Sequence, residues 1–153
     1  MTPSSTYVRT SFTWLAYLMV GYFSFLESTL GPALPSLQQE LNLNYTLVSL
    51  HFSAFALGII LTGLVGDRVI GRWGRRATVW GGALGMAVGE LLIAVGNSAA
   101  VTILGALTIG FLGSLTLVTV QAALSDTYGS RRVVAFSEAA VVASLCSIAA
   151  PLI

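Results

Sequence analysis

Charged side chains are scarce in this 153-residue sequence: only 8% of the residues are Asp, Glu, Lys or Arg, and none is lysine. A soluble domain carries about 25% charged residues, so this chain has too few of them to cover a surface in contact with water. Hydrophobic residues instead make up 56% of the chain. The net charge of +1 gives no indication of a nucleic-acid partner or an acidic one. The composition predicts a protein whose natural solvent is lipid.

Residues for disulfide, metal and nucleotide chemistry are also missing. The single cysteine, Cys146, excludes an intramolecular disulfide. One cysteine and one histidine, His51, are too few to build a metal site. The sequence has no Gly-Lys-Ser/Thr motif that would hold the phosphates of ATP, and no nucleophile is placed beside a base. We therefore expect no cofactor, no bound metal and no enzymatic activity.

Five apolar runs are long enough to cross a bilayer, which takes about 20 residues of helix. They cover residues 12–34, 47–66, 77–95, 99–122 and 134–153. We expect Pro32 and Pro35 to break the first helix and Thr46 to cap the start of the second. Residues 125–132 are predicted to form a polar loop before the fifth. The sequence thus predicts an all-α integral membrane protein with five transmembrane helices.

Small residues recur every four positions in the third and fourth runs. They are Gly81, Gly85 and Gly89 in the third run, and Ala106, Gly110 and Ser114 in the fourth. Such a pattern lets helix backbones approach closely in lipid, where no hydrophobic force drives helices together. The pattern predicts that these helices are built to pack closely against other helices.

The arginines are distributed unevenly between the two sides that five spans define. All basic residues are arginines and fall in the N-terminal tail, the second-to-third connection or the fourth-to-fifth connection: Arg9; Arg68, Arg72, Arg75 and Arg76; Arg131 and Arg132. With five spans these three segments share one side of the membrane, and basic residues mark the cytoplasmic side. We expect a multi-pass protein of the cell inner or plasma membrane with a cytoplasmic N-terminus.

The second-to-third connection contains a motif of glycine, aspartate and arginine, whose residues are Gly63, Asp67, Arg68, Gly74, Arg75 and Arg76. The motif resembles the signature of the major facilitator superfamily, which reads Gly, three residues, Asp-Arg, one residue, and then Gly-Arg-Arg or Gly-Arg-Lys. Here five residues separate Arg68 from Gly74. In a second alignment Gly71-Arg72 is the counterpart of the closing residues, and the Gly-Arg-Arg triplet begins the third helix.

The resemblance implies that residues 1–153 correspond to the first five of twelve helices, an incomplete N-terminal six-helix bundle. It implies a secondary active transporter that moves a small molecule by alternating access in symport or antiport, with coupling to protons. The expected partners are the lipid bilayer, a small-molecule substrate, protons and the missing C-terminal half of the same transporter. The chain ends at Pro151-Leu152-Ile153 with no polar tail, so we expect a fragment. The alternative is a membrane-embedded structural or assembly subunit without transport activity.

Ionisable residues inside the predicted spans are the candidates for the transport site, because a charge within a bilayer usually faces protein or water. Glu27 is the strongest candidate for proton coupling, and the alternative is a neutral, hydrogen-bonded structural carboxyl. His51 lies at a similar depth, where it either tunes the carboxyl or, as the favoured interpretation, is a polar cap near the membrane interface. Glu90 is expected to extend toward the membrane interface. Glu138 is expected to pair with Arg131, Arg132 or the arginines of the second-to-third connection. In the resembled family the position of Asp67 controls conformational cycling.

One feature departs from many family members, notably drug–proton antiporters, which carry an arginine within the fourth helix ahead of a glycine-rich stretch. Here that region, residues 104–110, contains no arginine. A drug–proton exchange mechanism that relies on such an arginine is therefore not supported by the sequence.

Overall fold

The computed structural model describes residues 8–152, so that residues 1–7 and 153, the two ends of the predicted domain, lie outside the described residues. The helices are α1 (Ser11–Glu40), α2 (Tyr45–Trp73), α3 (Arg75–Val95), α4 (Ala99–Tyr128) and α5 (Arg132–Ala149), with short 3-10 helices η1 (Gly129–Arg131) and η2 (Ala150–Leu152). The part of the chain that the structure describes contains no strand. The predicted all-α class is confirmed.

Three helical stretches among the described residues are long and apolar enough to cross a membrane. They are Tyr45–Trp73, Arg75–Val95 and Ala99–Leu152, and the last of them runs through α4, η1, α5 and η2. These stretches support a multi-pass membrane protein, whereas the count of five spans stays a prediction.

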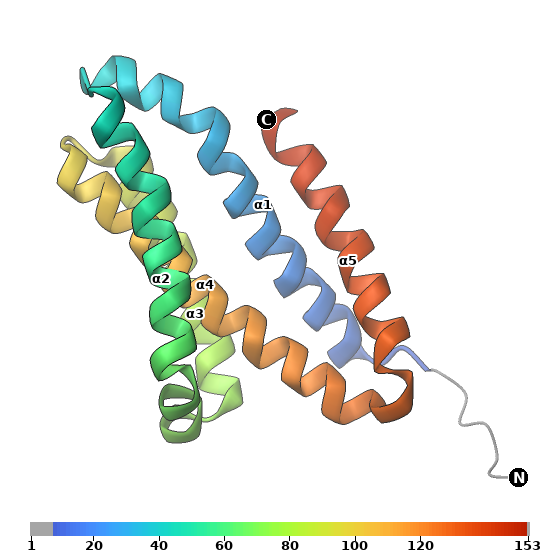
Figure 1. The fold of residues 1–153 in the computed structure, drawn as a ribbon. Helices are drawn as coiled ribbons and strands as arrows, with labels where there is room; N and C mark the ends of the chain where they lie inside the picture. Colours follow the sequence, from blue (N-terminus) through green and yellow to red (C-terminus); the bar gives the residue numbers. More distant parts are fainter. Residues whose placement is uncertain (1–7, 153) are drawn as a thin grey trace, which may run out of the picture.

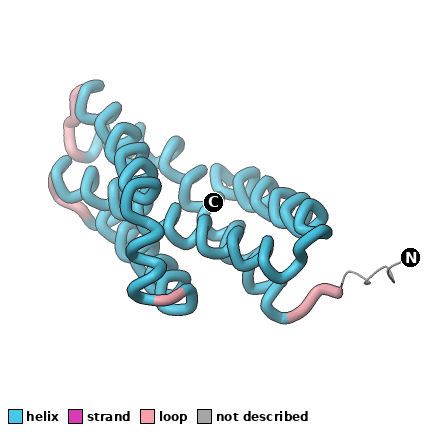
Figure 2. The backbone as a smooth tube through the Cα atoms, turned by 60° about the horizontal axis from the view of Figure 1, so that its bottom comes forward, coloured by secondary structure: helices cyan, strands magenta, loops and turns pink. Residues whose placement is uncertain are grey.

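Helix α4 is the centre of the arrangement, because it contacts α1, α2, α3 and α5. Figure 1 shows α1 and α5 lying side by side, with α4 leading from this pair to α2 and α3. In Figure 2 the loop segments lie at the ends of the helices. One end of the bundle, which we call the arginine end, is where α1, α3 and α5 begin and where α2 and α4 end (Figure 1).

Glycines set how closely α4 approaches its two neighbours. A methyl group on Gly58 of α2 would lie 2.6 Å from the carbonyl oxygen of Leu107 in α4, and one on Gly110 of α4 would overlap the carbonyl oxygen of Phe55 in α2. On the other side of α4, a methyl group on Gly105 would lie 2.6 Å from the carbonyl oxygen of Gly89 in α3. Because these obstacles are backbone atoms, α4 contacts α2 and α3 along their main chains.

Close packing occurs at small residues of both α3 and α4, but not at every residue of the predicted pattern. Gly81 faces open space, and the contact face of α3 carries Gly82, Gly85 and Gly89. Gly110 contacts α2 rather than α3. Gly81 lies four residues before Gly85 and Gly82 lies three before it, and both spacings place residues near each other on a helix surface. Only the packed structure shows which of the two faces α4.

Three predicted helix boundaries are corrected. α1 continues through Pro32 and Pro35 to Glu40. Each proline removes one backbone hydrogen bond, but both lie on the exposed side of α1, while Leu30, Leu34 and Leu37 are buried on the other. Packing of this buried face keeps the helix continuous.

Asn44, and not Thr46, caps the start of α2. Its side-chain oxygen accepts a hydrogen bond of 2.8 Å from the backbone N–H of Leu47. The predicted polar loop at residues 125–132 is also mostly helical, because α4 continues to Tyr128 and η1 then leads directly into α5.

Candidate functional site

A groove of about 440 Å³ opens between α1, α4 and α5 around Glu27. Its wall consists of Val20, Phe23, Ser24 and Glu27 from α1, Leu117 and Gln121 from α4, and Phe136, Ala139, Ala140 and Ala143 from α5. The volume lies within the range of about 300–1,000 Å³ that is usual for small-molecule sites. The groove is thus large enough for a small solute.

Most side chains in the wall of the groove are apolar, and a few are polar. Glu27 and Gln121 are exposed and Ser24 is half-buried. Glu27 supplies the one charged side chain among the described residues that line the groove. The alanines of α5 leave room next to it, because an alanine side chain extends no further than its methyl group.

His51 lies elsewhere in the bundle, at the contact between α2 and α4. It is fully buried: its Nδ1–H donates to the carbonyl oxygen of Leu47, 2.9 Å away, and its Nε2 lies 2.9 Å from the hydroxyl of Thr102. Both ring nitrogens therefore have hydrogen-bond partners within the protein. His51 does not line the groove around Glu27, so the structure does not bring together the two residues that the sequence placed at a similar depth.

Most residues of the glycine and arginine motif lie in helices and not in a loop. Gly63, Asp67 and Arg68 belong to α2, and Gly74, with a φ of 80°, is the single residue between α2 and α3. This backbone conformation favours glycine, because a side chain there meets its own main chain. Arg75 and Arg76, the last two residues of the triplet, begin α3.

Asp67 faces a second groove, which has a volume of about 290 Å³ and lies between α2 and α4. The lining residues are Ile59, Thr62, Gly63, Gly66 and Asp67 of α2 with Ser114 and Val118 of α4. The next residue, Arg68, donates from its guanidinium to the carbonyl oxygen of Leu64 at 3.3 Å. Asp67 is exposed, so its carboxylate is accessible to a further group at the arginine end.

Arg75 forms an ion pair with Asp126 of α4, whose oxygen lies 2.6 Å from a guanidinium nitrogen. This contact ties the start of α3 to the last turns of α4. Asp126 was not among the residues predicted to carry function. Its position could have indicated this role. Asp126 lies in the predicted fourth-to-fifth connection, which shares one side of the membrane with the four arginines of the second-to-third connection.

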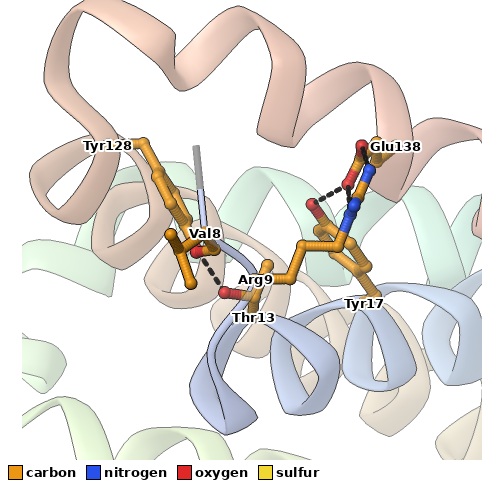
Figure 3. A network of polar contacts seen from close by, with 6 residues as sticks. All are labelled: Val8, Arg9, Thr13, Tyr17, Tyr128 and Glu138. Carbon is orange, nitrogen blue, oxygen red and sulfur yellow. Dashed lines mark hydrogen bonds and ion pairs between the residues drawn. The ribbon is translucent and has the colours of Figure 1, made fainter. Parts of the chain in front are cut away.

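Glu138 of α5 is held by Arg9 and Tyr17, as Figure 3 shows. The Nε and Nη2 atoms of Arg9 donate to the two carboxylate oxygens at 3.0 and 2.5 Å, and the hydroxyl of Tyr17 donates to Oε2 at 2.9 Å. The expected pairing of Glu138 with Arg131, Arg132 or the arginines of the second-to-third connection is wrong. Arg9 reaches it because the start of α1 packs beside α5.

A second set of contacts lies next to this one in Figure 3. The hydroxyl of Tyr128, at the end of α4, donates to the carbonyl oxygen of Val8 at 3.0 Å and also bonds to the hydroxyl of Thr13. Together with the Arg9–Glu138 contact, these bonds fasten the start of α1 to both α4 and α5.

Glu90 of α3 is half-buried and lies near Thr29 of α1. It lines a small pocket of about 190 Å³ that also includes Glu40 and Ser36 of α1. The expectation that Glu90 extends toward the membrane interface stays a prediction. Glu90 belongs to a contact between α1 and α3 and does not line the groove around Glu27.

The bundle of long apolar helices and the grooves between them define a polytopic helical membrane protein. The family model described as Major Facilitator Superfamily matches residues 13–153. Because this match covers nearly the whole sequence, the chain belongs to the major facilitator superfamily, as its glycine and arginine motif indicated. No curated protein and no solved structure matches the chain.

Membership of this superfamily makes the protein a transporter that acts in a membrane on small solutes. The family match and the apolar helices together support a multi-pass membrane location.

Proposed function

We propose that the protein is a secondary active transporter that works by alternating access and is coupled to protons through Glu27. The observation that carries the proposal is the position of Glu27, the one charged side chain among the described residues lining a groove of about 440 Å³ between α1, α4 and α5. A carboxyl within a membrane bundle usually marks an ion or substrate pathway. In this proposal the solute and the proton use the same groove.

The physical basis of coupling is that the carboxyl of Glu27 has two charge states. When it is ionised, closing the groove would remove a charge from water, which costs free energy unless a cation accompanies it. When it is protonated, the neutral side chain can be enclosed at a much smaller cost. Protonation therefore biases the equilibrium between open and closed arrangements, as a ligand that prefers one state does.

The proposed orientation follows from the arginine end. Arg9 precedes α1, Arg72 and Arg75 flank the link between α2 and α3, and Arg131 and Arg132 lie where η1 meets α5. Figure 1 shows these helix ends on one side of the bundle. Because basic residues stay on the cytoplasmic side, the arginine end, and with it the N-terminus, faces the cytoplasm of an inner or plasma membrane. The chain then crosses the bilayer with five helices.

The test is a comparison of net uptake with exchange in vesicles that contain the full-length protein. Glu27→Gln keeps the shape of the protonated side chain but cannot titrate. Net accumulation against a gradient should disappear, while exchange of labelled for unlabelled solute persists, since exchange needs no net movement of protons. Glu90→Gln is the matched control, because it removes another carboxyl of the bundle outside this groove, and it should retain accumulation.

Two results would contradict the proposal in different ways. Normal accumulation by Glu27→Gln means that the carboxyl is structural and has no part in coupling. Loss of both accumulation and exchange means that Glu27 binds the solute, so that its role is not limited to carrying the proton.

A further inference from the structure

We infer that a groove at the arginine end binds an anionic phospholipid, with the phosphate group at Arg76 and an acyl chain along the helices. The groove lies between α1, α3 and α4 and has a volume of about 470 Å³. Glu27 does not line it, so the inference goes beyond the proposed function and does not depend on it.

The interior of the groove is apolar. Ala16 and Val120 are buried in its wall, and the hydroxyl of Thr119 already donates to the carbonyl oxygen of Leu115 at 2.6 Å. On α1 the wall extends from Phe12 to Met19, a separation of about 10 Å along a helix. A hydrocarbon chain therefore finds an apolar path that leads away from the arginine end.

The charged side chains of the wall are Arg75 and Arg76, and no acidic side chain is among the described residues that line it. Arg75 is engaged by Asp126, whose carboxylate oxygen lies 2.6 Å from a guanidinium nitrogen. Between residues 8 and 152 the ion pairs are this one and Arg9–Glu138, so Arg76 has no acidic partner there. Arg76 is also exposed, and its guanidinium is open to an anion from outside the chain.

The tryptophans indicate that this end of the bundle lies at the depth of the lipid headgroups. The chain has three tryptophans, and all are exposed: Trp14 near the start of α1, Trp73 at the end of α2 and Trp80 in the second turn of α3. These helix ends belong to the arginine end (Figure 1). Tryptophan is enriched where a membrane meets water. Arg76, one turn before Trp80, is therefore level with lipid phosphates.

The charge of the headgroup follows from the charge of the wall. A guanidinium forms charge-assisted hydrogen bonds with phosphate oxygens. A zwitterionic lipid would add a cation beside Arg75 and Arg76, and no acidic side chain of the described wall would receive it. A free phosphate would contact the arginines but would leave the apolar wall uncovered. An anionic phospholipid uses both parts of the groove.

The experiment is native mass spectrometry of the purified full-length protein in detergent, titrated with phosphatidylglycerol. Phosphatidylcholine with the same acyl chains is the matched control ligand, because it differs in the charge of the headgroup. We expect tighter binding of phosphatidylglycerol, and no displacement of it by a tenfold excess of inorganic phosphate. Equal affinity for the two lipids would overturn the inference. Displacement by inorganic phosphate would show an anion site that does not use the acyl chain, and would overturn it as well.

Variants locate the site on the protein. Arg76→Gln should weaken the binding of phosphatidylglycerol about fivefold, which corresponds to about 1 kcal/mol for one basic residue at an anionic surface. Arg132→Gln is the matched control, because it removes an exposed arginine of the same end that does not line the groove. It should leave the affinity unchanged. An equal loss in the two variants would mean a diffuse attraction to the whole arginine end and no site in the groove.

Photochemical cross-linking identifies the occupant in the membrane itself. Phe12 is exposed at the groove, and it can be replaced in the full-length protein with p-benzoylphenylalanine, which is also aromatic. Illumination of membranes should give an adduct with the mass of an anionic phospholipid. An adduct with a peptide of the same chain, or with a second copy, would show that protein covers the groove and would overturn the inference.

Discussion

Gly110 of α4 is the position at which one added methyl group should most clearly destabilise the bundle. A Cβ atom there would overlap the carbonyl oxygen of Phe55 in α2 and would lie 2.9 and 3.0 Å from the carbonyl carbon and Cα of the same residue. Main-chain atoms cannot turn aside as a flexible side chain can. In Gly110→Ala, α2 and α4 must therefore move apart, and overpacking of this kind costs about 1–3 kcal/mol.

The matched control is Gly81→Ala in α3, because nothing lies within 4 Å of the Cβ position at Gly81. Both substitutions replace a helical glycine with alanine, which by itself stabilises a helix by about 0.5–1 kcal/mol. This gain is common to the two variants, so their difference reports the clash alone. We expect Gly110→Ala to be less stable than Gly81→Ala by about 1–3 kcal/mol.

The free energy of unfolding can be measured by titrating the purified full-length protein with a denaturing detergent, with helix content as the signal. Equal stability of the two alanine variants would refute the reasoning. In that case the close contact between α2 and α4 does not depend on the missing side chain at Gly110.

Three further predictions concern orientation, gating and the arginine end. A cysteine introduced at Gln39 should react with an impermeant reagent added to intact cells and one at Ser130 should not; the reverse pattern would contradict the proposed orientation. Asp67→Asn should slow transport with little change in solute affinity, because Asp67 lies outside the groove around Glu27, and an equal loss of affinity would place it in the binding site. Glu138→Ala should lower the free energy of unfolding by about 1–3 kcal/mol through loss of its charged hydrogen bonds. Asp126→Ala should cost less than about 1 kcal/mol, since that ion pair is more exposed, and a reversed order would contradict the role of the Glu138 contacts.

The sequence predicted those features that depend on local composition. The all-α class followed from the apolar runs, because bilayer thickness sets the length of such a run. The family followed from the motif around Asp67. Gly74 also stood out locally, and the structure places it at the one-residue link between α2 and α3. Glu27 lines a groove, and its role in proton coupling stays a prediction.

Features that depend on distant parts of the chain were not predictable. Arg9 and Glu138 are 129 positions apart in the sequence, and no local pattern connects them. The continuation of α1 through Pro32 depends on the packing of its opposite face, which local rules for proline do not include. The hydrogen bond between His51 and Thr102 likewise depends on the packing of α2 against α4, whereas the bond of His51 to Leu47 lies within α2.

The central position of α4 has a consequence for how the protein is made. Chains are synthesised from the N-terminus, so α2 and α3 enter the membrane before α4 exists. Their glycine faces pack mainly on α4 and much less on each other. Until Ala99 and the residues after it have been translated, these two helices have lipid in place of their native neighbour. Assembly of the bundle therefore begins only when α4 arrives, and a nascent chain that stops before Ala99 presents unpaired glycine faces to the quality-control machinery of the cell.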